Sequence, residues 1–286
     1  MDLEEMRRSD NVEDRRGMTP GRAGAGIGLG TIALVVVGYF FGISPSTMMN
    51  LVGAGQAVTQ GSGVSQSSGA VGKPKDPQGD FAAAVLGETE DVWGKYFAAS
   101  GQKYPPPTLV LFTGEVASAC GNTSAAAGPF YCPGDQKLYI DLDFFNQLAT
   151  EFGAPGQFAR AYVIAHEVGH HIQNLLGLTQ KSEQLSARQD AVGAKHISVE
   201  VELQADCFAG VWANQAQKVI QPGEIQQALQ AASSVGDDTL QKRMRGRVVP
   251  ETFTHGSSEQ RQRWFQNGFQ SGKIDSCDTF SAGSQL

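Results

Sequence analysis

The feature that most constrains the fold is a group of histidines in one short helical segment. The stretch AHEVGHHIQN (165–174) places three of the chain's five histidines within six positions, together with Glu167. Successive residues of an α-helix are about 100° apart, so His166 and His170 lie on one face, one turn apart. Two imidazoles in that arrangement can bind one metal ion with Glu167 beside them, the H-E-x-x-H pattern of zinc metallopeptidases. His171 lies about 100° from His170 and is not expected to bind the same ion.

The third metal ligand must come from another segment, because a catalytic zinc ion usually has three protein ligands and one open position. The extended H-E-x-x-H-x-x-G-x-x-H pattern fails, since positions 173 and 176 hold Gln and Leu. The segment VELQADCFAG (201–210) offers Glu202 and Asp206, four apart on one helical face. We expect Glu202 to bind the metal and Asp206 to accept a hydrogen bond from the outer nitrogen of a zinc histidine, His166. The alternative is a solvated helix face.

A third segment, THGSSEQR (254–261), contains the last histidine of the chain. A group that stabilises a tetrahedral oxyanion must come from outside the two zinc helices, and His255 is the candidate. Arg261 could orient His255 or bind a carboxylate. Ser257 can also act as a helix N-cap, with Gln260 completing a capping box, and both interpretations can hold together.

The three segments together resemble one family of bacterial proteins. HEVGHH, ELQADCFAG and THGSSEQR are similar to the YpfJ-type neutral zinc metallopeptidases, and this resemblance extends over the whole chain. More distantly, the order H-E-x-x-H, E-x-x-x-D and T-H, with Arg six residues after the last His, resembles the HtpX-like and CAAX-prenyl membrane metalloproteases. One departure is Gly256, because those distant relatives usually have Pro after the downstream histidine.

This gluzincin-type resemblance implies a role for each matching residue. The zinc ligands, one ion per chain, would be His166, His170 and Glu202. Glu167 would be the general base, Asp206 would support a ligand, and His255 would lie near the transition state.

The expected reaction is hydrolysis of a peptide bond in a peptide or protein substrate, with Glu167 accepting a proton from a zinc-activated water. The segment KLYIDL (137–142) is predicted to be an edge strand that could pair with an extended peptide. Two alternatives remain open: an inactive zinc-binding scaffold of the cell envelope, and a zinc amidase that acts on cell-wall material. No oligomeric state is predicted.

An uncharged apolar run covers residues 24–43. Twenty helical residues at about 1.5 Å each span about 30 Å, the hydrocarbon thickness of a bilayer. We expect one transmembrane helix; the alternative is a signal peptide cleaved near Gly53. Arginines precede the run and the next basic residue is Lys73, which predicts a cytoplasmic N-terminus and a periplasmic or extracytoplasmic body.

Four regions are therefore expected. These are a cytoplasmic polar tail (1–23), a transmembrane helix (24–43), a flexible Gly/Ser/Gln linker (44–80) and a zinc metallopeptidase domain (81–286). The formal net charge of −7 argues against a nucleic-acid partner, which would need a basic surface. The membrane is a partner only through the N-terminal helix.

The chain's cysteines are expected to form disulfides outside the cytoplasm. Cys120 and Cys132 flank a Gly/Ala/Ser-rich loop and are the favoured pair, which leaves Cys207 with Cys277. The alternative is four reduced thiols.

Apolar periodicity predicts a mostly helical α+β domain with a small β-sheet, preceded by the transmembrane helix. The resemblance implies that this domain is zincin-like. Strands are predicted at 108–112 and 137–142. Helices are predicted at 81–100, 143–152, 158–176, 180–217 with a break near Gly193, 223–232, 237–243 and 257–270. Ala205 and Ala209 would let the second zinc helix approach the first closely.

Overall fold

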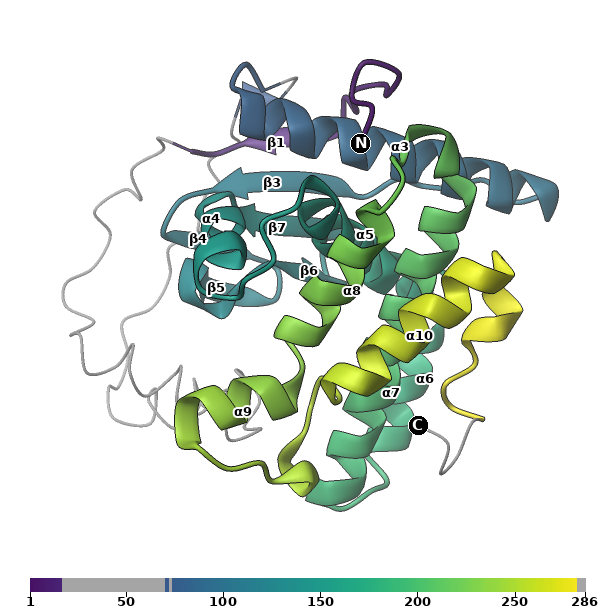
Figure 1. Ribbon diagram of the computed structural model, residues 1–286. Coiled ribbons are helices and arrows are strands. Elements are labelled where there is room, and N and C mark those ends of the chain that lie inside the picture. The colour runs from purple at the N-terminus through teal and green to yellow at the C-terminus, as the bar shows by residue number, and fades with distance from the viewer. Residues whose placement is uncertain (17–69, 72–73, 282–286) are drawn as a thin grey trace, which may run out of the picture.

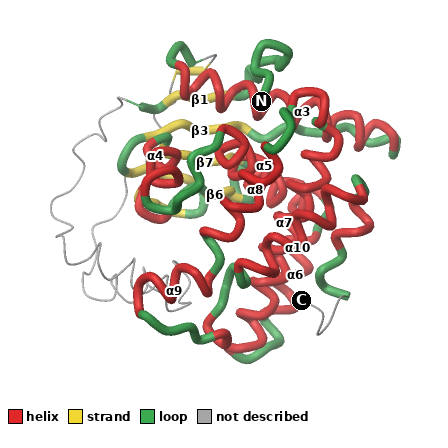
Figure 2. The backbone as a smooth tube through the Cα atoms, in the orientation of Figure 1, coloured by secondary structure: helices red, strands yellow, loops and turns green. Residues whose placement is uncertain are grey.

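The computed structural model describes residues 1–16, 70–71 and 74–281 as a mostly helical α+β fold, in which a small sheet lies beside a group of helices (Figures 1 and 2). The helices are α3 (Pro77–Ala99), α4 (Asp143–Thr150), α5 (Gln157–Leu175), α6 (Leu178–Ser186), α7 (Ala191–Gln215), α8 (Glu224–Ser234), α9 (Asp237–Arg245) and α10 (Ser258–Ser271). The strands are β1 (Val12–Asp14), β2 (Ala70–Val71), β3 (Thr108–Phe112), β4 (Glu115–Ser118), β5 (Gly121–Ser124), β6 (Phe130–Cys132) and β7 (Lys137–Asp141).

The main sheet has five strands in the order β2-β1-β3-β7-β6. β1, β3 and β7 are mutually parallel, and β2 and β6 run antiparallel at the two edges. The prediction that 137–142 is an edge strand is wrong, because β7 is hydrogen-bonded on both sides, to β3 and to β6. The edge beside β7 is β6, a three-residue strand that the sequence pattern did not indicate.

The two faces of the sheet are buried by different elements. Along β3, Leu109 and Leu111 belong to the main core with the helices, whereas Val110 and Phe112 pack in a smaller core with Val116 of the β4–β5 hairpin. This alternation follows from the two-residue period of a strand. A parallel strand covered on both faces reads as a continuous apolar run, which explains the sequence TLVLF.

Helix α5 lies at the centre of the helical group and packs against α3, α7 and α8. Its central position explains why Ala159, Ala161 and Ala165 are fully or almost fully buried. Helices α7 and α10 approach each other through glycine: a Cβ atom at Gly268 would lie 1.9 Å from the carbonyl oxygen of Cys207. Only glycine permits that separation, so α10 is held tightly against α7.

Most of the predicted helices are confirmed within one to four residues at their ends. The break predicted near Gly193 lies a few residues earlier, between α6 and α7, where Asp190 caps the N-terminus of α7 by accepting hydrogen bonds from the backbone N–H groups of Val192 and Gly193. At α10, Ser257 and Gln260 form the predicted capping box.

The N-terminal segment 1–16 belongs to the folded body, which corrects the expected separate tail. Val12 is fully buried, β1 pairs with β3 in the middle of the sheet, and Ser9 donates its backbone N–H to Ala83 of α3. Four arginines that precede the apolar run lie in the described residues, and each is in an ion pair: Arg7 with Glu90 and Asp91, Arg8 with Asp80, Arg15 with Glu13, and Arg16 with Asp14 and Asp76. A segment hydrogen-bonded into a sheet lies on the same side of any bilayer as that sheet.

The expected linker also ends earlier than predicted. Residues 70–71 form β2, and α3 begins at Pro77, with Asp76 as its N-cap. The predicted transmembrane helix 24–43 lies outside the described residues. Among the helices that the structure describes, none combines the length and apolar character needed to cross a bilayer.

Two disulfides join Cys120 to Cys132 and Cys207 to Cys277, the pairing that the sequence favours. The first closes the loop between the β4–β5 hairpin and β6. The second ties α7 to a short 3-10 helix, η4 (Ile274–Cys277), at the C-terminal end of the described chain.

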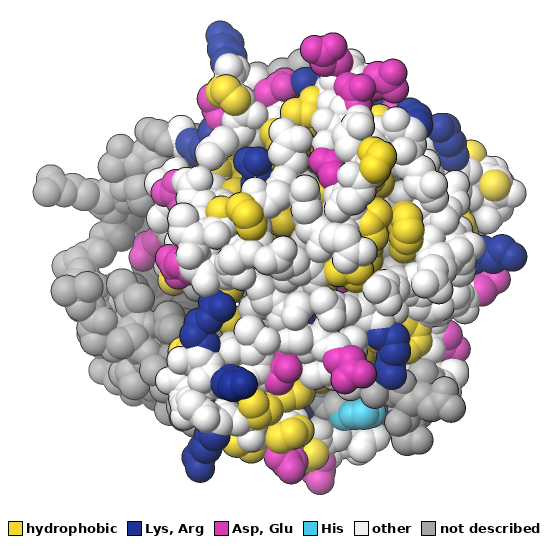
Figure 3. Space-filling view, in the orientation of Figure 1, with side chains coloured by type: hydrophobic (Ala, Val, Ile, Leu, Met, Phe, Trp, Pro, Cys, Tyr) yellow, Lys and Arg dark blue, Asp and Glu magenta, His cyan; other side chains and the backbone are white. Residues whose placement is uncertain are grey.

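On the face shown in Figure 3, acidic and basic side chains are interspersed rather than grouped by sign.

Candidate metal centre

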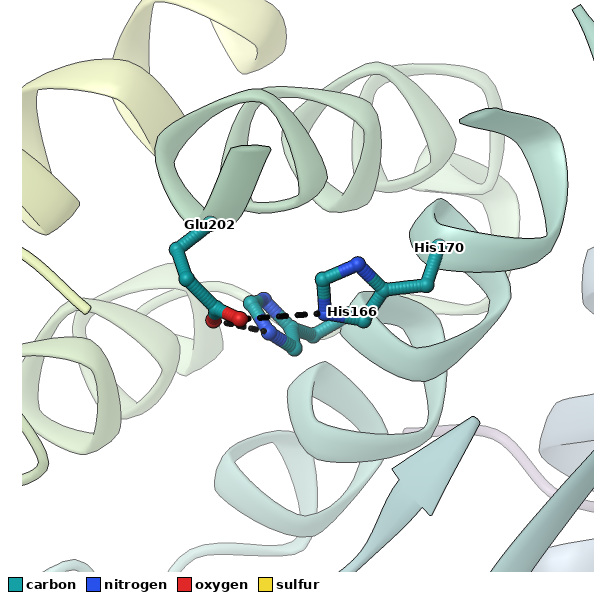
Figure 4. Close-up of side chains that lie close together, drawn as sticks. All are labelled: His166, His170 and Glu202. Atoms are coloured by element: carbon teal, nitrogen blue, oxygen red, sulfur yellow. Dashed lines mark hydrogen bonds and ion pairs between the residues drawn. The ribbon is translucent and has the colours of Figure 1, made fainter. Parts of the chain in front are cut away.

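Helices α5 and α7 bring His166, His170 and Glu202 together. One nitrogen of each imidazole and one carboxylate oxygen lie within 4.8 Å of one another. Figure 4 shows the two imidazoles on one side and Glu202 reaching toward both of them from the facing helix. We refer to these three residues as the His–His–Glu cluster. His166 and Glu202 are 36 residues apart in the sequence, and helical periodicity sets the direction of each side chain on its own helix.

The donor atoms of this cluster fit a zinc ion. His166 Nε2 lies 3.2 Å from Glu202 Oε2, and His170 Nε2 lies 3.6 Å from Glu202 Oε1. Tetrahedral zinc with ligands at about 2.0–2.1 Å separates neighbouring donors by about 3.3 Å. The donor set of two imidazoles and one carboxylate is also that of catalytic zinc sites, which keep a fourth position open.

The electrostatics of the cluster favour positive charge. Burial alone would raise the pKa of Glu202, but the neighbouring His170 and His166 outweigh it and hold the pKa of Glu202 well below its usual value. Burial alone would lower the pKa of His166, but the carboxylates of Asp206 and Glu202 raise it to about 10. A divalent cation between these groups would supply the charge that they favour.

Asp206 supports His166 from behind. Its Oδ1 accepts a hydrogen bond from His166 Nδ1 at 2.8 Å, and the side chain is fully buried. Asp206 also accepts a hydrogen bond from the hydroxyl of Tyr162 and from the guanidinium of Arg261, whose Nε lies 2.7 Å from Oδ2. A carboxylate on Nδ1 fixes the imidazole tautomer that directs the Nε2 lone pair toward the cluster.

Arg261 therefore binds a carboxylate, one of the two roles considered for it. Its two bonds to Asp206 are part of a buried ion pair, and the residue is only 4% exposed. Arg261 thus acts on the cluster through Asp206.

Glu167 is buried beside the cluster on α5 and is 7% exposed. Burial raises the pKa of its carboxyl group, which the neighbouring His170 and His166 partly offset. A carboxyl group with a raised pKa is a better proton acceptor in its ionised form, which suits a general base.

His255 lies near the cluster in the loop before α10, and its charge helps to lower the pKa of Glu202. Its Nδ1 is 3.3 Å from Asp237 Oδ1, while Oδ2 of Asp237 accepts the backbone N–H groups of Thr254, His255 and Gly256. Asp237, at the N-terminus of α9, thus holds both the ring and the loop. No motif in the sequence indicates this role for Asp237.

Gly256 explains the departure from the Pro found in distant relatives. Its φ angle is +87°, in the left-handed region, and its N–H donates to Asp237 at 3.1 Å. Proline has a fixed φ near −65° and no N–H, so it could adopt neither feature. The loop that carries His255 is therefore built differently in this chain.

His171 points away from the cluster, as predicted. Its Nε2 donates to the carbonyl oxygen of Pro105 at 2.8 Å, so Nδ1 is an acceptor for the Tyr131 hydroxyl at 2.9 Å. Burial lowers the pKa of His171 to about 4, which the hydrogen bond to Pro105 partly opposes. This neutral imidazole fastens edge strand β6, through Tyr131, to the helix that carries the cluster.

Three supporting residues escaped the sequence analysis: Tyr162, Gln173 and Asp237. Tyr162 precedes His166 by four positions, so helical spacing could have indicated it. Gln173 lies three positions after His170 and could have been found the same way. Asp237 gave no such signal, because it is 18 residues from His255 in sequence.

Comparisons with known proteins also point to a zinc metallopeptidase family. The family model described as "Putative neutral zinc metallopeptidase" matches residues 1–280. "Uncharacterized protein YpfJ" of Escherichia coli K12 is 43% identical over 285 residues, covering 96% of both chains. "Uncharacterized protein Rv2575" of Mycobacterium tuberculosis H37Rv and "Uncharacterized protein Mb2605" of Mycobacterium bovis are each 50% identical over 192 residues, covering 63% of this chain and 64% of theirs. No solved structure matches the chain.

Proposed function

The chain belongs to the neutral zinc metallopeptidase family, and on that premise we propose that it is a zinc-dependent, zincin-like peptidase that hydrolyses peptide bonds. One zinc ion per chain would be held by the His–His–Glu cluster. The observation that carries the proposal is the convergence of these three side chains from two helices, with the buried carboxyl of Glu167 next to them. A purely structural zinc site would have four protein ligands and would need no base.

When bound, a zinc ion lowers the pKa of a water molecule and polarises a carbonyl group. Glu167 accepts a proton from the attacking water and later delivers it to the leaving amine. Asp206 holds the Nδ1 proton of His166, so that the ring keeps its Nε2 lone pair directed at the cluster. His255, held by Asp237, donates a hydrogen bond to the oxygen that gains negative charge in the transition state.

The substrate would bind as an extended peptide along β6. Three observations support this: β6 is an edge of the main sheet, it packs against α5, and Tyr131 ties it to His171, the neighbour of cluster residue His170. An edge strand offers unpaired backbone N–H and C=O groups to an added strand. β6 takes the role first expected of residues 137–142.

The body would work outside the cytoplasm, attached to the membrane through residues 24–43. The two disulfides support the location, since disulfides persist in oxidising compartments. Because β1 is part of the sheet, residues 1–16 would lie on the same side of the membrane as the body, so a single crossing by residues 24–43 is not part of this proposal. Cell fractionation with thiol labelling tests this: a membrane-bound protein without free thiols is expected, and a reduced protein in the cytosol would contradict it.

The enzymatic proposal is tested by metal analysis and peptide cleavage on the full-length protein. We expect about one zinc per chain and cleavage of a mixed peptide library, read by mass spectrometry. Glu167→Gln should keep the zinc and lose turnover by about 10²–10⁴-fold, because the general base is gone. Glu202→Ala should lose the zinc itself.

The outcomes separate the alternatives. A wild-type protein that binds zinc and cleaves purified cell wall but no peptide would be an amidase. One that binds zinc and cleaves neither would be a scaffold. An unchanged rate in Glu167→Gln would remove the general-base assignment.

A further inference from the structure

The second histidine of the cluster has a supporting chain of buried amides. His170 Nδ1 lies 2.8 Å from Oε1 of Gln173, which is three residues further along α5 and only 2% exposed. His166 has a carboxylate, Asp206, at the equivalent nitrogen, whereas His170 has this neutral amide. An amide can face an imidazole with its oxygen or with its nitrogen, so something must fix its orientation.

A backbone carbonyl group fixes the orientation of the Gln173 amide. The side-chain nitrogen of Gln173 lies 2.7 Å from the carbonyl oxygen of Val201 on α7, and a carbonyl oxygen only accepts hydrogen bonds. The NH₂ group of Gln173 must therefore face Val201, and its oxygen must face His170. His170 Nδ1 then carries the proton, which leaves the lone pair on Nε2, the nitrogen that lies 3.6 Å from Glu202 Oε1.

A second glutamine extends this chain to the C-terminal segment. Gln204 of α7 is 4% exposed and donates its NH₂ to the carbonyl oxygen of Cys277 at 2.8 Å. Its own oxygen is thereby turned toward Gln173 and accepts a hydrogen bond from Gln173 Nε2 at 3.1 Å. Cys277 is held in place by its disulfide with Cys207, three residues after Gln204 on the same helix.

We propose that Gln173 and Gln204 are positioning residues that set the metal-binding tautomer of His170, and that the Cys207–Cys277 disulfide maintains this setting. The inference rests on the proposed zinc site. The disulfide keeps the Cys277 carbonyl beside Gln204, Gln204 orients Gln173, and Gln173 orients His170. Disulfide formation would thus be coupled to zinc affinity through three side-chain hydrogen bonds.

Zinc affinity, measured by competition with a chromophoric chelator on the full-length protein, tests the glutamines. Gln173→Met removes all three side-chain hydrogen bonds of Gln173 at nearly constant volume and should weaken zinc binding about 10–100-fold, the usual effect of losing a partner of a metal ligand. Gln204→Met should give a smaller loss, since Val201 still orients Gln173. The matched control is Asn214→Leu, which removes an α7 amide that donates to the Phe269 carbonyl without reaching the cluster; its zinc affinity should stay at the wild-type value.

The Nδ1 proton of His170 gives a readout that a merely structural role would not change. In the zinc-loaded wild type we expect a downfield, slowly exchanging imidazole proton by NMR, because Gln173 accepts it. In Gln173→Met this signal should move upfield and exchange faster, whereas Asn214→Leu should leave it unchanged.

The disulfide is tested by paired serine substitutions. Cys207→Ser with Cys277→Ser should weaken zinc binding, whereas Cys120→Ser with Cys132→Ser should not, because that disulfide has no bond to the amide chain. If the first pair does not fold, Gln204→Met carries the test alone. A wild type that binds no zinc would overturn the proposed function. A wild type that binds zinc, with Gln173→Met equal to it in affinity and in the His170 signal, would overturn this inference only.

Discussion

Gly169 of α5 lies directly against the backbone of Ala205 of α7. A Cβ atom added to Gly169 would be 2.8 Å from the carbonyl oxygen of Ala205 and 3.0 Å from its Cα. Both neighbours are helical backbone, so neither can move without moving its helix. Since His170 follows Gly169 directly and Glu202 is three residues before Ala205, this contact sets the distance between metal ligands of the two helices.

Gly169→Ala should therefore push α7 away from α5. We expect zinc affinity to fall at least about tenfold, by analogy with other losses of ligand support, and the free energy of unfolding to fall by about 1–3 kcal/mol from overpacking. Chelator competition and denaturant unfolding measure the two effects. The control is Gly94→Ala in α3, where an added Cβ meets nothing within 4 Å; it should raise stability by about 0.5–1 kcal/mol. Equal behaviour of the two variants would contradict this account of the helix contact.

Asp206 and Arg261 form a buried ion pair behind His166, so removing one partner should be costly. We expect Asp206→Asn to lower the free energy of unfolding by about 3–5 kcal/mol, because the Arg261 charge loses its partner. Zinc affinity should fall about 10–100-fold. The double variant Asp206→Leu with Arg261→Met should recover much of the stability but none of the zinc affinity. Recovery of both would mean that Asp206 has no role at the metal.

His255 is expected to act in the reaction without binding the metal. His255→Ala should reduce kcat about 10²–10³-fold, as for the loss of one oxyanion donor, with zinc content unchanged. Asp237→Asn should give a smaller loss, because it weakens the hold on the ring and on the loop. A variant that lost zinc in proportion to activity would identify His255 as a metal ligand instead.

Residues 1–16 should detach from the body as the pH falls. The hydrogen bond from Arg16 lowers the pKa of Asp76 to about 2, and Arg8 lowers the pKa of Asp80. A folded pKa below the ordinary value of about 3.9 means that the pairing stabilises above about pH 4 and is lost as pH falls toward 2. Pepsin, which is active in that range, should cleave this segment before the rest of the body.

Two substitutions that remove a carboxylate charge at nearly constant shape test this detachment, one inside the ion pairs and one outside them. Asp76→Asn keeps a helix N-cap but loses the ion pair, so cleavage should begin at higher pH than in the wild type. Asp275→Asn, at an exposed carboxylate outside these ion pairs, should match the wild type. A segment that stayed resistant down to pH 2 would show that the buried contacts of β1 hold it without the ion pairs.

The sequence predicted the local elements of the site well because helical spacing is a local property. A spacing of four places His166 with His170, and Glu202 with Asp206, on single faces whatever the rest of the chain does. The capping box at Ser257 is equally local. The mostly helical α+β class followed from the same periodicities.

The failures concern short strands and contacts between distant segments. β1 and β6 have three residues each, too few for a two-residue period to be recognised, and their strand state depends on pairing with β3 and β7. The ion pairs of the N-terminal arginines were also missed, since three of their six acidic partners lie in α3, more than 70 residues away.

By itself, the sequence determined which side chains share a helical face, and therefore which residues could form half of a metal site. Only the tertiary structure decided how the halves meet: the glycine contact between α5 and α7, the carboxylate behind His166, the amide chain behind His170 and the strand at the sheet edge. The physical reason is that periodicity fixes the direction of a side chain relative to its own helix, whereas only packing brings a partner on another helix within bonding distance.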